Sequence, residues 1–61
     1  NGLTKADRKA LQKRLTAQGY DTQGADGVIG PDTRAAIRAY QSATGASVTG
    51  DPSKALLRNL G

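Results

Sequence analysis

The chain has 61 residues, a formal net charge of +4 at pH 7, and neither cysteine nor histidine. This length allows one small domain at most. Without Cys and His there is no disulfide framework, no ordinary zinc ligand set, and no histidine base for nucleophilic chemistry. Glutamate is also missing, so a pair of tuned carboxylates for glycoside cleavage is not expected. The sequence therefore predicts a domain that is not an enzyme and needs no cofactor and no metal.

The positive charge favours anionic partners, which include nucleic acid, an anionic membrane surface and an acidic cell-wall polymer. No apolar run is long enough to cross a bilayer, so we expect no membrane insertion. Asn1-Gly2 looks like the end of a linker. We expect residues 1–61 to form a single monomeric domain that belongs to a longer protein.

The first predicted element is a helix over residues 5–17. Thr4 and Asp7 have the spacing of a capping box, in which a hydroxyl and a carboxylate satisfy backbone N–H groups at a helix start. The apolar residues recur at helical spacing on one face and comprise Ala6, Ala10, Leu11 and Leu15. Gly19 is expected to end this helix.

A loop rich in glycine and aspartate, residues 20–30, leads into a second predicted helix over residues 31–43. Gly27 and Gly30 permit backbone angles that other residues disfavour, and Pro31 suits the first helical position. The apolar face of this helix comprises Thr33, Ala36, Ile37 and Tyr40. Gly45 is expected to end it.

A short third helix is predicted over residues 52–59, with Asp51 as its cap and Pro52 at its first position. Leu56, Leu57 and Leu60 would turn this helix toward the core. Three helices with two glycine-rich connections predict a small all-α three-helix bundle.

The ordered pattern resembles the peptidoglycan-binding-like domain. The residues that carry the resemblance are Leu11-Gln12, Leu15, Gly19-Tyr20, Asp26-Gly27, Gly30-Pro31, Thr33, Ala36-Ile37, Tyr40-Gln41, Gly45, Thr49-Gly50 and Leu56. Tyr40 stands where this family often has Phe. The resemblance implies a non-catalytic module that holds a hydrolase, lytic transglycosylase, amidase or transpeptidase on bacterial peptidoglycan. It also implies a periplasmic or extracellular location at the cell wall.

The candidate binding site is a shallow groove between residues 20–30 and the exposed face of the second helix. Asp26 is expected to bond loop N–H groups in an Asx turn, and Tyr20 either stacks on a sugar ring or packs on the core. The second helix would add a polar face that can bind carboxylates. The predicted ligand-binding residues are Tyr20, Asp26, Gly27, Ile29, Gly30, Thr33, Arg34, Arg38 and Gln41.

Two alternatives remain open at this stage. In a nucleic-acid-binding helix-turn-helix, Lys54, Arg58 and Asn59 could line the recognition helix. However, the segment between the second and third helices is longer than the usual turn, so we expect peptidoglycan as the partner and no nucleic acid. The other alternative is a protein-interaction module or a prodomain similar to the matrix metalloproteinase propeptide, although without a cysteine it has no inhibitory thiolate.

Overall fold

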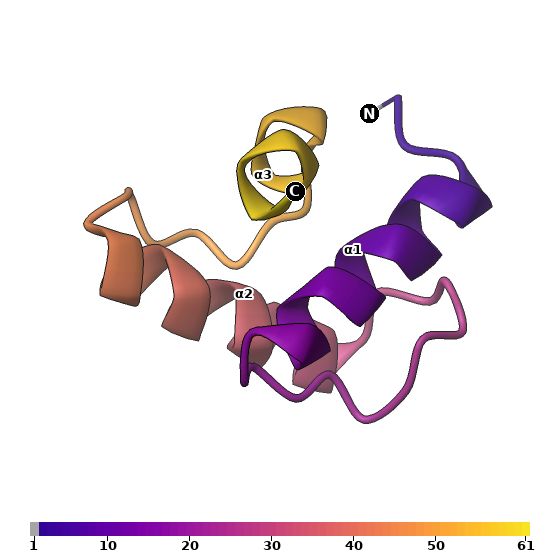
Figure 1. Cartoon of the computed structure of the whole chain (residues 1–61), viewed down its shortest axis with the longest axis horizontal. Helices are drawn as coiled ribbons and strands as arrows, with labels where there is room; N and C mark the ends of the chain where they lie inside the picture. Colours follow the sequence, from indigo (N-terminus) through magenta and orange to yellow (C-terminus); the bar gives the residue numbers. More distant parts are fainter. Residues whose placement is uncertain (1) are drawn as a thin grey trace.

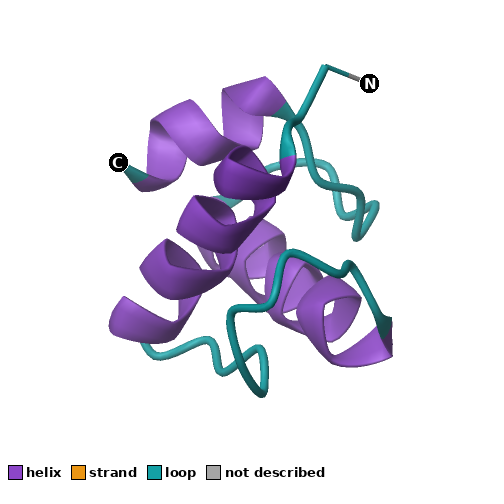
Figure 2. Cartoon of the chain, turned by 90° about the vertical axis from the view of Figure 1, so that its right-hand side faces the viewer, coloured by secondary structure: helices purple, strands orange, loops and turns teal. Residues whose placement is uncertain are grey.

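The computed structural model describes residues 2–61 and contains, within that range, three α-helices and no strand (Figure 1). They are α1 (Lys5–Ala17), α2 (Pro31–Thr44) and α3 (Lys54–Leu60). Helix α1 packs against both α2 and α3, and the connections are irregular loops (Figure 2). The predicted all-α three-helix class is confirmed.

Both ends of α1 are set by local hydrogen bonds that the sequence indicates. The Thr4 hydroxyl accepts from the Asp7 N–H, and the Asp7 carboxylate accepts from the Thr4 N–H, each at 3.1 Å. At the other end, the Gly19 N–H donates to Thr16 O at 3.0 Å and the Tyr20 N–H to Leu15 O at 2.9 Å. Gly19 has a φ of +97°, which completes a Schellman-type termination that favours glycine.

Helix α2 starts at Pro31, as expected, and extends one residue beyond the predicted end, to Thr44. Gly45 follows in the left-handed conformation, with a φ of +77°. The Ala46 N–H then donates to Gln41 O at 2.9 Å, which closes the last turn.

The predicted start of α3 is wrong by two residues, because Ser53 caps this helix and Asp51 does not. The Ser53 hydroxyl accepts from the Leu56 N–H at 3.0 Å. Asp51 instead accepts a hydrogen bond from the Arg34 guanidinium at 2.8 Å. Ser53, two residues after Asp51, is also a favoured capping residue, and it sets the boundary.

The core lies where the three helices meet. Its buried hydrophobic residues are Leu11, Leu15, Ala36, Ile37, Tyr40, Leu56 and Leu60, with Tyr20 and Leu57 packed against them. In α1 the buried residues begin at Leu11, so Ala6, predicted on the apolar face, lies at the surface. The small core positions loop 18–30 against α1 and the start of α2.

Candidate functional site

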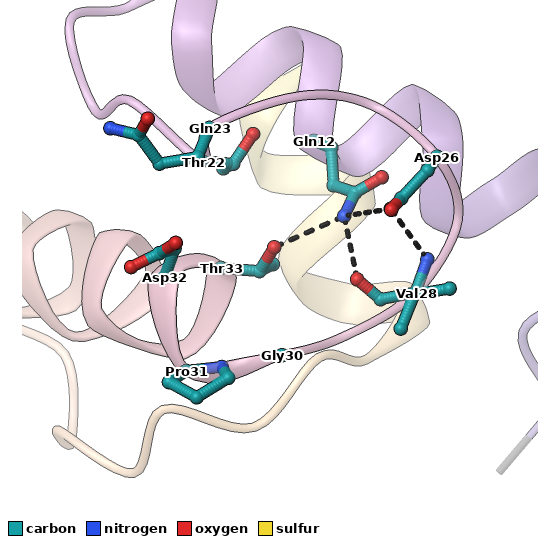
Figure 3. A pocket seen from close by; sticks show the side chains of 9 residues that line it. All are labelled: Gln12, Thr22, Gln23, Asp26, Val28, Gly30, Pro31, Asp32 and Thr33. Carbon is teal, nitrogen blue, oxygen red and sulfur yellow. Dashed lines mark hydrogen bonds between the residues drawn. The ribbon is translucent and has the colours of Figure 1, made fainter.

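A buried glutamine joins loop 18–30 to two helices. Gln12 of α1 is 1% exposed, and its Oε1 accepts from the Gly27 N–H at 2.8 Å. Its Nε2 lies 2.9 Å from Val28 O, 3.0 Å from Thr33 Oγ1 and 3.4 Å from Asp26 Oδ1 (Figure 3). We call Gln12, Asp26, Gly27, Val28 and Thr33 the Gln12 network. It ties the loop to α1 and to the first turn of α2.

In the turn at Asp26-Gly27, the Asp26 side chain supplies a hydrogen bond and Gly27 supplies a backbone conformation that favours glycine. Asp26 Oδ1 accepts from the Val28 N–H at 2.9 Å, which confirms the predicted Asx turn. Gly27 has a φ of +83°, and a Cβ added there would lie 2.8 Å from Lys5 Cγ and 3.4 Å from Lys5 O. The Gly27 carbonyl also accepts from Arg8 Nε at 2.6 Å. A side chain at position 27 would therefore push the loop away from α1.

These contacts lower the pKa of Asp26 below its usual value of 3.8, chiefly through the Val28 N–H, with help from the Gln12 amide and the Lys5 charge. A depressed folded-state pKa adds stability that is present above the unfolded pKa and is lost as the pH falls through the folded pKa. We expect the wild type to lose more stability than Asp26→Asn between pH 7 and strongly acidic pH. Urea unfolding of both proteins at each pH measures this difference, and parallel losses would contradict it.

Between this loop and the start of α2 lies a pocket of about 150 Å³. The lining residues come from α1, the loop and the first turn of α2, as Figure 3 shows. They are Gln12, Thr22, Gln23, Asp26, Val28, Gly30, Pro31, Asp32 and Thr33. The lining includes the carboxylates of Asp26 and Asp32 and no lysine or arginine. The pocket is therefore acidic, although the domain as a whole has a positive net charge.

Only part of the predicted site lines this pocket. Asp26, Gly30 and Thr33 do, whereas Gly27 is buried in the turn behind it and Ile29 is half-buried outside it. The half-buried ring of Tyr20 packs edge-on against Tyr40, with centroids 5.8 Å apart. Of the two roles open to Tyr20, the structure therefore shows core packing.

The predicted exposed face of Arg34, Arg38 and Gln41 is wrong for Gln41, which is 8% exposed. Gln41 lies one helical turn after Ile37 and so shares its buried row. Its Oε1 accepts from the N–H groups of Thr49 at 2.9 Å and Gly50 at 3.0 Å, and its Nε2 donates to Thr49 Oγ1 at 3.2 Å. The side-chain amide is thus engaged within the domain.

The two arginines lie along loop 45–53 and do not line the pocket. Arg34 pairs with Asp51 and also reaches Gly50 O, 3.4 Å away. Arg38 covers Gly50, where an added Cβ would lie 3.0 Å from its Nη1. A pocket therefore lies between the loop and the start of α2, where the groove was predicted, but the arginine face is not part of it.

Gln12 and Gln41 play the same structural role in two places. Each accepts the N–H of a left-handed glycine, Gly27 at a φ of +83° and Gly50 at +76°. No role for Gln12 is predicted from the sequence alone. The available signal was its place directly after the core residue Leu11, as Gln41 follows Tyr40.

Comparison with known proteins identifies the family. The model of the peptidoglycan binding domain family matches residues 4–60. The chain therefore belongs to this family, and it is a non-catalytic peptidoglycan-binding module associated with the cell wall. A search of curated proteins finds no match. Among residues 2–61, no helix is long and apolar enough to span a membrane, and no cluster of three metal-ligating side chains occurs.

Two solved structures of SltB3 from Pseudomonas aeruginosa contain a similar domain. In the complex with NAG-anhNAM-pentapeptide, the identity is 45% and the TM-score 0.92 over 95% of this chain. In the complex with NAG-NAM-pentapeptide, the identity is 44% and the TM-score 0.93 over 97% of this chain. In both cases the match spans 16% of the SltB3 chain, so this domain is similar to one small part of a longer protein.

Proposed function

We propose that this module binds peptidoglycan in the pocket held by the Gln12 network and thereby keeps an attached cell-wall enzyme on its substrate. The observation that carries the proposal is a preformed pocket, about 150 Å³, in a domain of the peptidoglycan binding family. Small-ligand sites are commonly concave and largely preformed. This domain is similar to a small part of SltB3, which was crystallised with NAG-peptide ligands. That similarity supports attachment of the domain to an enzyme such as a lytic transglycosylase.

The proposed place of action is the periplasm or the extracellular wall, where peptidoglycan is found.

Co-sedimentation with purified insoluble peptidoglycan tests this function, with DNA-cellulose as the control. We expect retention on peptidoglycan that weakens as salt rises, because the domain carries a net charge of +4 and the wall is anionic. Retention on DNA-cellulose alone would instead favour a nucleic-acid-binding protein. Absence of retention on peptidoglycan at low salt would contradict the proposal.

The position of the arginines leads to a second expectation. Since Arg34 and Arg38 face loop 45–53, they act on the wall only as diffuse charge. Arg34→Ala with Arg38→Ala should reduce retention about as much as Lys9→Ala with Lys13→Ala, which removes the same charge from α1. A much larger loss for the arginine pair, at an unchanged melting temperature, would place the ligand on α2 beside loop 45–53.

A further inference from the structure

Two side chains of α1 hold both backbone polar groups of Gly27. The Gly27 N–H donates to Gln12 Oε1 at 2.8 Å, and the Gly27 carbonyl accepts from Arg8 Nε at 2.6 Å. Arg8 and Gln12 lie one helical turn apart, so they share a face of α1. Arg8 is half-buried and Gln12 is buried. The position of this turn against α1 therefore depends on the arginine as well as on the glutamine.

A second hydrogen bond fixes the direction of the Arg8 guanidinium. Its Nη1 donates to Leu3 O at 3.1 Å, in the segment that enters α1. Because the guanidinium is planar and its donors point in fixed directions, the bond to Leu3 also orients Nε toward Gly27. A hydrogen bond from a charged donor is roughly twice as strong as a neutral one. Arg8 thus adds a charge-assisted attachment to the neutral ones that Gln12 makes.

The residues on either side of Gly27, Asp26 and Val28, line the pocket, whereas Gly27 and Arg8 do not. A change in the orientation of the Gly27 peptide groups would move both neighbours, because these groups are planar and rigid. The turn has no room to move closer to α1, since an added Cβ on Gly27 would lie 2.8 Å from Lys5 Cγ. Loss of the Arg8 bond would therefore let the turn move away from α1 and displace this part of the pocket lining.

We propose that Arg8 is a positioning residue for ligand binding, which sets the place of Asp26 and Val28 without touching the ligand. This inference rests on the proposed function, because it concerns the affinity of the same pocket. The role depends on the direction of the Arg8 donors and not only on the positive charge. A lysine at position 8 would keep the charge but not the planar pair of donors that joins Leu3 to Gly27.

Arg8→Met tests the proposal, because methionine keeps an apolar stem and has no donor. Arg14→Met is the matched control on the same helix. The Arg14 Nη1 donates to Leu57 O of α3 at 3.1 Å, away from the pocket. Each variant therefore removes one positive charge and an arginine bond to a backbone carbonyl oxygen. The probe is the soluble fragment NAG-NAM-pentapeptide, the ligand in one of the SltB3 structures.

NMR titration of the folded 61-residue chain measures the Kd of this probe. We expect Arg8→Met to raise the Kd about tenfold. Arg14→Met should change the Kd by about twofold or less, through screened charge alone. Arg8→Lys should fold and recover only part of the affinity. In the free protein, the Gly27 and Val28 amide signals should shift in Arg8→Met and stay in place in Arg14→Met.

Three results would overturn the inference: a wild-type Kd in Arg8→Met, equal losses in the two methionine variants, or full recovery of affinity in Arg8→Lys. The last two would reduce Arg8 to diffuse charge. The proposed function fails separately. If the wild type does not bind the probe or the wall, that function is wrong and this inference falls with it. If the wild type binds and Arg8→Met binds equally well, only the positioning role is wrong.

Discussion

Gln12→Ala is expected to lower the free energy of unfolding by about 3 kcal/mol or more. It leaves the Gly27 N–H without its acceptor and removes the hydrogen bonds to Val28 and Thr33. Each buried polar group left without a partner costs about 1–3 kcal/mol. Because the core of a domain this small rarely supplies more than about 3–5 kcal/mol, much of the population should unfold. Urea unfolding followed by circular dichroism measures the loss.

Gln18→Ala is the matched control, at the residue that directly follows α1. Gln18 is exposed and makes one side-chain bond, from Nε2 to Leu60 O at 3.0 Å. Its removal should cost about 1 kcal/mol or less. Equal losses from both variants would show that the Gln12 network does not hold the loop.

Ile37→Ala is expected to destabilise the domain by about 2–5 kcal/mol, the range for truncating a fully buried aliphatic side chain. Ile37 is 0% exposed and belongs to the core where the three helices meet. With no disulfide to support the fold, this loss could abolish folding. Thermal unfolding measures it.

The same truncation at Ile29 provides the comparison, because that side chain is half-buried and lies outside the core cluster. Ile29→Ala should lower the melting temperature clearly less than Ile37→Ala. A melting temperature of Ile37→Ala within a degree or two of the wild type would contradict the assigned core.

The sequence predicts the structure correctly where residues close together in the chain determine it. The Thr4 capping box, the Asx turn at Asp26 and the left-handed Gly45 all depend on neighbours a few residues away. The start of α3 was misplaced because Asp51 and Ser53, two residues apart, are both of a type that caps helices. In the structure Ser53 accepts from the Leu56 N–H, whereas Asp51 pairs with Arg34 from a distant part of the chain.

In the candidate site, too, the features set by neighbouring residues were predicted and those set by distant contacts were not. The loop and the start of α2 were predicted from their glycines and Pro31, and they do enclose the pocket. Gln12 was missed because its hydrogen-bond partners lie far along the chain, and its place directly after Leu11 is only a weak local sign of burial. Gln41 was placed on the wrong face for the same reason, since its amide meets Thr49 and Gly50 only after the chain has folded back.

Chemical-shift mapping with soluble peptidoglycan fragments tests the central claim, that this domain binds peptidoglycan in the pocket between loop 18–30 and α2. We expect the largest backbone amide shifts within residues 22–33, with small changes along loop 45–53 and α3. Shifts centred on Arg34, Arg38 and loop 45–53, or on the outer face of α1, would contradict it.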